Sequence, residues 1–340
     1  MTDPDKPGSR PEHEIPLAII IPAYKPDYLA RTLESLVRQT DRRFRLYVFD
    51  DASPADIGAI AREALGGYPH VFKRFEDNLG GQSLVRHWSR CIELTDEPWV
   101  WLFADDDLMD AECVAAFYRF LESDGDADVV RFDARIIGED DRVIGLHPLH
   151  LERETWLEYA YGRLMGWRLT IMQQMIFRRE ACQRAGGFQD LPLGWHTDDA
   201  AVIALARIRP VRHLAGARMY WRRSEHNITP DDSPAMRRAK MLASCLFARW
   251  LHGLLQGPRE TLFEHDGAVF ASIMDRFLVD RIVTEGALPA LANWSLLART
   301  RREVCGAHPL GLLKFICYAG ISGIVSGFGD WLKRVAGRAS

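Results

Sequence analysis

The chain lacks the sequence signals of several common protein classes. Its six cysteines include no C-x-x-C pair, so we expect buried free thiols in a reducing compartment rather than a zinc site or a disulfide framework. Residues 1–14 are polar, contain proline and have no apolar segment, which indicates a disordered leader and not a secretory signal. The absence of G-x-G-x-x-G after the first predicted strand, and of G-x-x-x-x-G-K-[ST] anywhere, argues against dinucleotide-binding and P-loop folds.

The composition is that of a soluble globular protein, with 340 residues, of which 47% are hydrophobic and 26% charged. A formal net charge of -4 gives no support to a nucleic-acid partner, because such binders usually carry a basic face. The charge is uneven: residues 1–233 hold 29 Lys and Arg against 39 Asp and Glu, whereas residues 234–340 hold 14 against 8. Long helical periodicities also begin at Pro234. We therefore predict an α/β domain over 15–233 and a helical C-terminal region over 234–340.

Three apolar, β-branched runs predict strands that are buried on both faces, at residues 17–21, 44–49 and 99–103. Segments with helical periodicity separate these runs, so that strands and helices alternate along the chain. This alternation predicts a mostly parallel sheet with helices on both faces.

Unusual polar residues follow each of the three strands. They are Pro22-Ala23-Tyr24, Asp50-Asp51 and Asp105-Asp106-Asp107. Ligands of open parallel sheets bind beyond the carboxyl ends of the strands, so these residues are expected to meet in one crevice. Five carboxylates there repel one another unless a cation or a donor-rich ligand is present, and oxygen ligands favour Mg²⁺ or Mn²⁺ bridging to phosphates. Acidic turns also serve as helix N-caps and solvated loops. We favour that interpretation for Asp50-Asp51 alone, and metal binding for Asp105–Asp107.

Five motifs in order resemble glycosyltransferase family 2. They are Ile-Pro-Ala-Tyr, Val-Phe-Asp-Asp-Ala-Ser, Asp-Asn-Leu-Gly-Gly, Trp-Leu-Phe-Ala-Asp-Asp-Asp-Leu, and Gly-Gly-Phe followed by Trp-His-Thr-Asp-Asp-Ala. The resemblance covers roughly residues 15–229. It implies the GT-A fold, a Rossmann-like and mostly parallel sheet flanked by helices, to which this chain adds an α-helical C-terminal extension. It also implies inverting sugar transfer from a nucleotide-sugar donor.

The resemblance further implies roles for the matching residues. Pro22, Ala23 and Tyr24 line the nucleobase pocket; Asp50 or Asp51 accepts from the base or the ribose; Asn78 lies near the base, and Arg86 faces the base or the diphosphate. Arg86 lies one position further from Asn78 than the usual pattern has it.

The acidic triplet matches the Asp-x-Asp element of that family. In the match, Asp107 contacts the metal directly, Asp105 serves the ribose and the metal, and Asp106 belongs to the donor site. Many members carry the first acid where Ala104 stands here, so the register of the triplet remains open.

Inverting transfer also needs a base, because a sugar hydroxyl is a poor nucleophile until a carboxylate takes its proton. Asp198 and Asp199 resemble the acidic base motif of the family, and the spacing of the apolar residues that follow favours Asp199 narrowly. The alternative is that Thr197 or Asp198 is an N-cap and that Asp199 favours the positive end of the helix. Arg222 or Arg223, in a segment that we interpret as a mobile loop, supplies positive charge to the departing diphosphate.

The segment 309–335 is the most apolar part of the chain. Between Lys314 and Asp330 it holds 15 residues without charge, fewer than the roughly 20 that a bilayer span needs. A core helix, an oligomer contact and an in-plane membrane anchor are the three interpretations, and the first is the safest. The third gains weight because acceptors in this family are often lipid-linked glycans.

The leading hypothesis is an inverting transfer of a hexose from a nucleotide-diphospho-sugar, UDP-linked by preference, to a glycan or lipid-linked acceptor in surface polysaccharide assembly. The expected location is the cytoplasm, at the inner face of the cell membrane. A sugar nucleotidyltransferase is one alternative, but the Gly-rich basic motif that such enzymes usually carry near the first strand is absent here. A non-catalytic nucleotide-sugar-binding or scaffold protein is the other.

Overall fold

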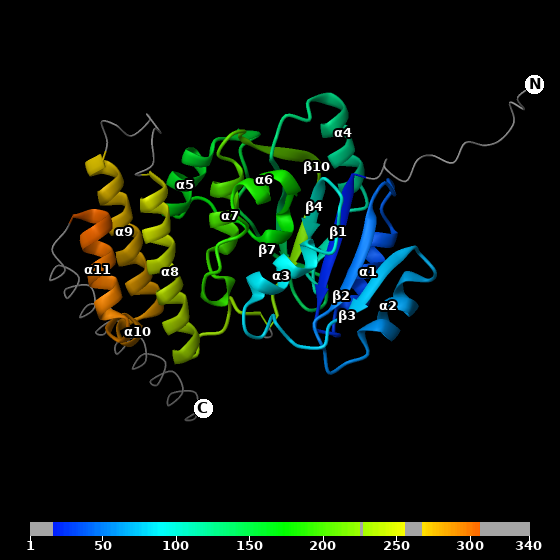
Figure 1. Cartoon of the computed structure of the whole chain (residues 1–340), viewed down its shortest axis with the longest axis horizontal. Helices are drawn as coiled ribbons and strands as arrows, with labels where there is room; N and C mark the ends of the chain where they lie inside the picture. The colour runs from blue at the N-terminus through cyan, green and yellow to red at the C-terminus, as the bar shows by residue number, and fades with distance from the viewer. Residues whose placement is uncertain (1–15, 225–226, 256–266, 307–340) are drawn as a thin grey trace, which may run out of the picture. The chain divides into compact units, whose positions relative to one another are not determined.

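A computed structural model describes residues 16–224, 227–255 and 267–306 (Figure 1). The expected leader 1–14 and the apolar segment 309–335 lie outside the described residues. The chain divides into two compact units, each built from several segments. Within the described parts of the chain, no helix is long and apolar enough to cross a membrane.

The first unit comprises residues up to 156, 170–188 and 204–222 and is built on one ten-stranded sheet. The strand order is β3-β2-β1-β4-β9-β6-β10-β5, with β7 beside β6 and β8 beside β10. The first four strands of this order are mutually parallel, as are β6 and β10, whereas β9 runs antiparallel to both of its neighbours. The sheet is therefore mostly parallel in its blue-to-cyan half (Figure 1). The strand bounds are β1 Leu17–Ala23, β2 Arg45–Asp50, β3 His70–Arg74, β4 Trp99–Leu102, β5 Leu108–Met109, β6 Val129–Ile137, β7 Val143–Leu146, β8 Arg153–Glu154, β9 Met175–Arg178 and β10 Val211–Arg222.

Helices cover both faces of the parallel strands. Leu17, Ile19 and Ile21 of β1 belong to one buried cluster with apolar residues of α1, α2 and α4. Ala18 and Ile20 are equally buried on the opposite face, where α3 packs against β1. This two-sided burial explains why β1 is a continuous apolar run rather than an alternating one. The helix bounds of this part are α1 Leu29–Val37, α2 Ile57–Leu65, α3 Leu84–Ile92, α4 Cys113–Ser123 and α6 Arg179–Arg184.

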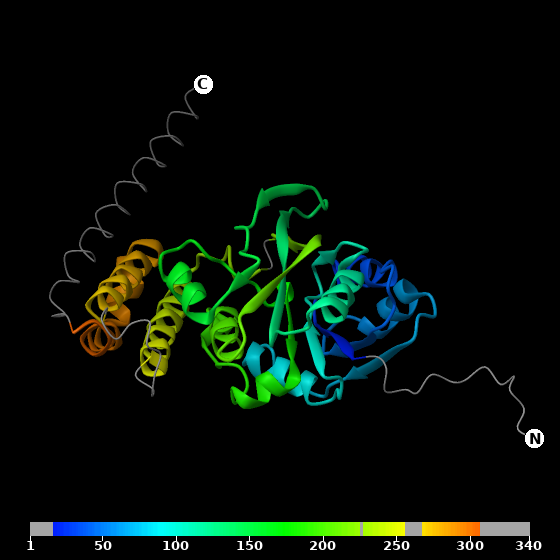
Figure 2. The ribbon, with the colours of Figure 1, turned by 90° about the horizontal axis from the view of Figure 1, so that it is seen from above.

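The second unit comprises residues 157–169, 189–203 and the chain from 223 onward. Its core is a helical layer in which α8 Pro234–Leu255, α9 Gly267–Glu285 and α11 Trp294–Cys305 pack against one another, with the short α10 Ala287–Ala292 beside them. Figures 1 and 2 both show α8, α9 and α11 side by side. Most of α5 Trp156–Leu164 and of α7 Thr197–Leu205 also belongs to this unit.

Several local expectations differ from the structure. The first helix, α1, begins at Leu29, with Tyr28 as its N-cap and no side-chain cap bond. The segment that we interpreted as a mobile loop begins inside β10, which extends to Arg222. The predicted domain boundary at 233/234 lies near the last crossing between the units, at 222/223, but 157–169 and 189–203 also join the second unit.

The expected free thiols are present: Cys91, Cys113, Cys182 and Cys245 are buried, Cys305 is half-buried, and Cys317 lies outside the described residues.

Candidate active site

The carboxyl ends of β1, β2 and β4 meet at one edge of the sheet. Ala23 pairs with Asp50 in register, and the backbone N–H of Asp51 donates to the Ala23 carbonyl over 2.9 Å. Beyond β1, the backbone N–H groups of Tyr24 and Lys25 both donate to Oδ2 of Asp105, each over 2.8 Å. The predicted meeting of Tyr24 with the acidic triplet is therefore present as a direct contact.

The three acidic side chains after β4 turn toward different partners. Asp105 accepts the two N–H groups at the end of β1, and Asp106 Oδ2 lies 2.7 Å from the ammonium of Lys25. Asp107 Oδ1 accepts from the backbone N–H of Arg222 over 2.8 Å. All three residues are buried.

Burial dominates the electrostatics of this acidic loop, residues 105–107. It raises the pKa of Asp105 to about 6, with the negative charge of Asp106 as the second cause. The pKa of Asp107 is raised well above its ordinary value by the same two causes. The described residues thus undercompensate the negative charge of the loop, which favours binding of a further cation.

Arg222 has a different position from the one that we expected. Its side chain is fully buried, with Nε donating to the Asp106 carbonyl over 2.8 Å and NH1 to the Gly138 carbonyl over 2.8 Å. NH2 lies 2.5 Å from a carboxylate oxygen of Asp141. A guanidinium engaged on all sides fixes the acidic loop to the end of β10. Arg222 thereby suits a positioning role better than a contact with the donor.

The fit of a divalent cation can be tested on the carboxylates themselves. No cluster of three or more His, Cys, Asp or Glu side chains within the described ranges is arranged to hold a metal. Oδ2 of Asp107, however, is buried without a hydrogen-bond partner. Mg²⁺ and Mn²⁺ commonly use one or two carboxylates and complete their shell with phosphate oxygens and water. The acidic loop fits that pattern. Asp107 and Asp106 would hold the ion, Asp106 replacing the predicted Asp105, whose Oδ2 already accepts two backbone hydrogen bonds.

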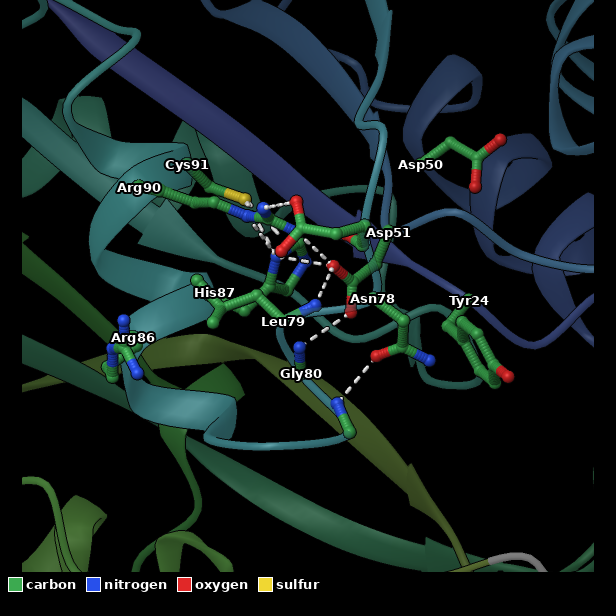
Figure 3. Close-up of polar contacts among 12 residues, drawn as sticks. Tyr24, Asp50, Asp51, Asn78, Leu79, Gly80, Arg86, His87, Arg90 and Cys91 are labelled. Atoms are coloured by element: carbon green, nitrogen blue, oxygen red, sulfur yellow. Dashed lines mark hydrogen bonds and ion pairs between the residues drawn. The ribbon is translucent and has the colours of Figure 1, made fainter.

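Asp51 lies in a dense polar cluster (Figure 3). Leu79 and Gly80 donate backbone N–H groups to its carboxylate over 3.1 and 2.8 Å, and His87 Nδ1 lies 3.1 Å from Oδ1. Arg90 completes the cluster with an ion pair to Oδ1. A Cβ atom at Gly80 would lie 2.6 Å from Asp51 Oδ2, so the close approach requires glycine there. The backbone of Leu79 and Gly80 therefore holds this carboxylate in place.

The basic residue that meets this carboxylate is Arg90, which was not among the predicted residues. Arg86 is exposed and points away from Asp51 in Figure 3, whereas His87 and Arg90 point toward it. Position 90 lies one helical turn after position 86, so an i,i+4 step from Arg86 is the signal in the sequence that points to Arg90. Burial lowers the pKa of His87 to about 4, so this side chain is neutral near pH 7.

The other predicted donor-site residues surround this cluster. Asp50 forms an ion pair with Arg74 and accepts the Ser53 N–H over 2.8 Å. Asn78 Oδ1 accepts the Gly81 N–H over 2.6 Å, which closes the turn. Tyr24 is 40% exposed, and the Ser53 hydroxyl donates to its carbonyl over 2.6 Å. A ring presented to solvent beside buried polar groups can accept a stacked base.

Asp198 and Asp199 begin α7, in the second unit, and differ in environment. Asp199 is buried: Tyr159 donates to Oδ1 over 2.6 Å, Arg163 Nε donates to Oδ2 over 2.7 Å, and His196 Nδ1 lies 2.9 Å from Oδ2. Burial alone would raise the pKa of Asp199, but Arg163 and His196 outweigh it and lower the value to about 2. A carboxylate so stabilised is a weak base. Asp198 is half-buried at the same helix terminus.

His196 supports this arrangement from an unusual backbone conformation. Its φ of 68° lies in the left-handed region, which costs a non-glycine residue of order 1–3 kcal/mol. The imidazole stacks on Phe247, with ring centroids 4.9 Å apart, and Nε2 lies 3.1 Å from the Ser244 hydroxyl. The turn before α7 is thereby fixed to α8.

Comparisons with known proteins agree with this arrangement. The Glycosyl transferase family 2 profile matches residues 18–185. The UDP-GlcNAc complex of TarS residues 1–349 from S. aureus has a TM-score of 0.53 and 14% identity, covering 87% of this chain and 92% of that one. The mannosyltransferase PcManGT from Pyrobaculum calidifontis, in complex with GDP-Man and Mn²⁺, has a TM-score of 0.51 and 14% identity, covering 91% and 87%. At these low identities, the structural similarity shows a common fold and no more.

A curated relative, the protein y4gI of Sinorhizobium fredii (strain NBRC 101917 / NGR234), which carries the description "Uncharacterized protein", is 24% identical over 237 residues, or 67% of this chain. The chain spans about a quarter (24%) of the length of that relative. The matched profile contains β1, β2, β4 and the acidic loop, and the fold agrees with the GT-A structures above. Residues 18–185 are therefore a domain of glycosyltransferase family 2 with the GT-A fold.

Proposed function

We propose that the protein is an inverting glycosyltransferase that takes a sugar from a nucleotide-diphospho-sugar. The observation that carries the proposal is the double hydrogen bond from Tyr24 and Lys25 to Asp105, because it joins the β1 end to an undercompensated acidic loop. One edge of the sheet then presents an exposed aromatic ring for a base and carboxylates for a cation that grips a diphosphate. The family match supports the reaction class.

The donor nucleoside binds at the ends of β1 and β2. Tyr24 stacks on the base between Pro22-Ala23 and Asn78. Asp51, whose carboxylate already has four protein partners, positions the Leu79–Gly80 backbone beside the base. Asp50 stays with Arg74 and fixes the turn after β2. Asp105 is a positioning residue, because its Oδ2 already accepts two backbone hydrogen bonds.

Asp107 and Asp106 hold Mg²⁺ or Mn²⁺ together with the donor phosphates. A bound ion of this kind supplies Lewis-acid stabilisation of the departing nucleoside diphosphate. Arg222 acts indirectly, by fixing the Asp106 carbonyl and the backbone of the loop. PcManGT in complex with GDP-Man and Mn²⁺ supports a metal in this class of site.

Asp198 is the general base in this proposal, in place of the narrowly preferred Asp199. This residue is half-buried, whereas Asp199 is buried and has its pKa lowered to about 2 by Arg163 and His196, which makes it a weak base. The base takes the proton of the acceptor hydroxyl as its oxygen attacks the anomeric carbon and the bond to the diphosphate breaks.

For the finer specificity, a UDP-linked hexose and a glycan or lipid-linked acceptor in surface polysaccharide assembly stay our working hypothesis. The complexes of TarS with UDP-GlcNAc and of PcManGT with GDP-Man support a nucleotide-sugar and leave the base open between uracil and guanine.

The test is hydrolysis of a panel of nucleotide sugars by the full chain in the presence of Mn²⁺, read as release of nucleoside diphosphate. We expect turnover of one donor, abolished in Asp107→Asn and strongly reduced in Asp198→Asn. Donor binding without turnover of any donor or transfer to any acceptor would support the scaffold alternative and contradict the proposal.

A further inference from the structure

Lys25 is a cation already seated in the acidic loop. Its Nζ lies 2.7 Å from Asp106 Oδ2, and its backbone N–H donates to Asp105, so the residue contacts two members of the triplet. Its side chain is 32% exposed, whereas that of Asp106 is 5% exposed. The ammonium therefore approaches a buried carboxylate from the solvent side.

The same carboxylate is one of the two ligands assigned above to the divalent cation. Two cations cannot both approach one carboxylate oxygen closely without strong repulsion in a buried setting. A lysine ammonium is a compact point charge on a flexible stem, and it can swing away while its backbone N–H stays on Asp105. The geometry thus brings the lysine and the metal into competition for Asp106.

We propose that Lys25 is a resident counter-ion that leaves Asp106 when a divalent cation binds there, and that its freed ammonium then contacts the donor diphosphate. Without a metal, Lys25 offsets part of the negative charge of the acidic loop. In the loaded site it neutralises phosphate charge instead. This inference rests on the proposed function, and it adds a donor-phosphate residue and an order of events to that function.

Amine labelling of the wild-type full chain tests the exchange directly. A small acylating reagent is applied, and the labelling rates of Lys25 and of the exposed Lys73 are compared by peptide mass spectrometry. We expect slow labelling of Lys25 without metal, several-fold faster labelling with Mn²⁺ alone, and protection again with Mn²⁺ and UDP or GDP. Lys73 should not respond. A Lys25 rate that Mn²⁺ leaves unchanged overturns the proposal.

Direct Mn²⁺ binding, measured by electron paramagnetic resonance, gives the second test. Lys25→Met should bind Mn²⁺ about tenfold more tightly than wild type in the absence of nucleotide, equivalent to about 1.4 kcal/mol. With UDP or GDP present, Lys25→Met should bind the nucleotide more weakly. Arg31→Met removes an exposed positive charge that pairs with Asp141 rather than with the triplet, and should stay within about twofold of wild type.

The outcomes separate this inference from the proposed function. If donor turnover is present but Lys25→Met behaves like Arg31→Met, the counter-ion role is wrong and the enzymatic function stands. If Mn²⁺ changes the labelling of Lys25 but no donor is turned over, the function is wrong and the competition stands. Absence of Mn²⁺ binding to both wild type and Lys25→Met contradicts the inference whatever the turnover.

Discussion

The acidic loop of the first unit and Asp199 of the second unit are both buried carboxylate sites, but their charges are balanced in opposite ways. In the loop, burial raises the pKa of Asp105 to about 6, and the Lys25 ammonium contacts one of the three adjacent carboxylates, Asp106. Around Asp199, Arg163, His196 and Tyr159 overcome burial and lower the pKa to about 2.

The difference distinguishes a site that needs a ligand from one that is complete. A carboxylate whose oxygens all have protein partners contributes to stability and has little capacity to take up a proton or a cation. Carboxylates whose mutual repulsion is not relieved, such as Asp107 with its unpartnered Oδ2, gain from an added cation. The two regions therefore predict different responses to the same Asp→Asn change.

The comparison would fail most clearly if Asp199, and not Asp198, were the general base. We expect Asp198→Asn to lower kcat by about 10²–10⁴-fold, the usual contribution of a general base. Asp199→Asn should lower kcat much less when corrected for the folded fraction. Nucleoside diphosphate release under saturating donor measures both, and the reverse order of the two variants would return the base assignment to Asp199.

Stability should show the opposite order. Asp199→Asn leaves the Arg163 guanidinium buried without its carboxylate, and breaking such a pair costs about 3–5 kcal/mol. Asp106→Asn removes the ion pair with the partly exposed Lys25 and should change the unfolding free energy of the metal-free protein by no more than about 0.5 kcal/mol. Urea unfolding followed by circular dichroism compares the two. Equal losses would show that the acidic loop is as complete as the Asp199 cluster.

Acid should weaken the second unit in two steps. Burial lowers the pKa of His196 to about 4, below its ordinary 6.5, so the unfolded chain binds this proton first and stability falls as the pH drops from about 6.5 to about 4. Asp199, lowered to about 2, adds a further loss between about 4 and 2.

Urea midpoints measured across this pH range test the two steps. His196→Asn keeps a residue that tolerates positive φ and should remove the His196 part of the upper step, leaving the part that the lowered pKa of His87 contributes. An unchanged profile in that variant would contradict the assignment to His196.

The smallest effect is expected at a third buried carboxylate, Asp51, whose ion pair with Arg90 should affect nucleotide binding. Arg90→Met removes its ion pair and should weaken UDP or GDP binding by about tenfold, near 1.4 kcal/mol. Arg86→Met, on the exposed side of the same helix, should stay within about twofold. Isothermal titration in the presence of Mn²⁺ measures both. Equal effects of the two variants would place the nucleotide elsewhere.

The sequence predicted those strands whose burial produces a local run of apolar residues. The apolar runs of β1, β2 and β4 predicted strands because burial on both faces requires them, and the structure has them within one or two residues. β10 was missed because its apolar residues are broken by charged ones and by a bulge near Gly216, so that its strand character comes from pairing with β6. Arg90 was missed because the motif that starts at Asn78 does not say which basic residue of α3 contacts Asp51.

The sequence by itself determined the α/β succession and the strand-end location of the acids, because periodicity and the polarity after each buried strand are local properties. Only the tertiary structure decided the role that each charged side chain can take. It buried Arg222 under the loop, completed Asp199 with three partners and placed Lys25 on Asp106. The reason is physical: the charge state and reactivity of a carboxylate depend on the burial and on the partners that distant segments bring to it, and no spacing in the chain records those.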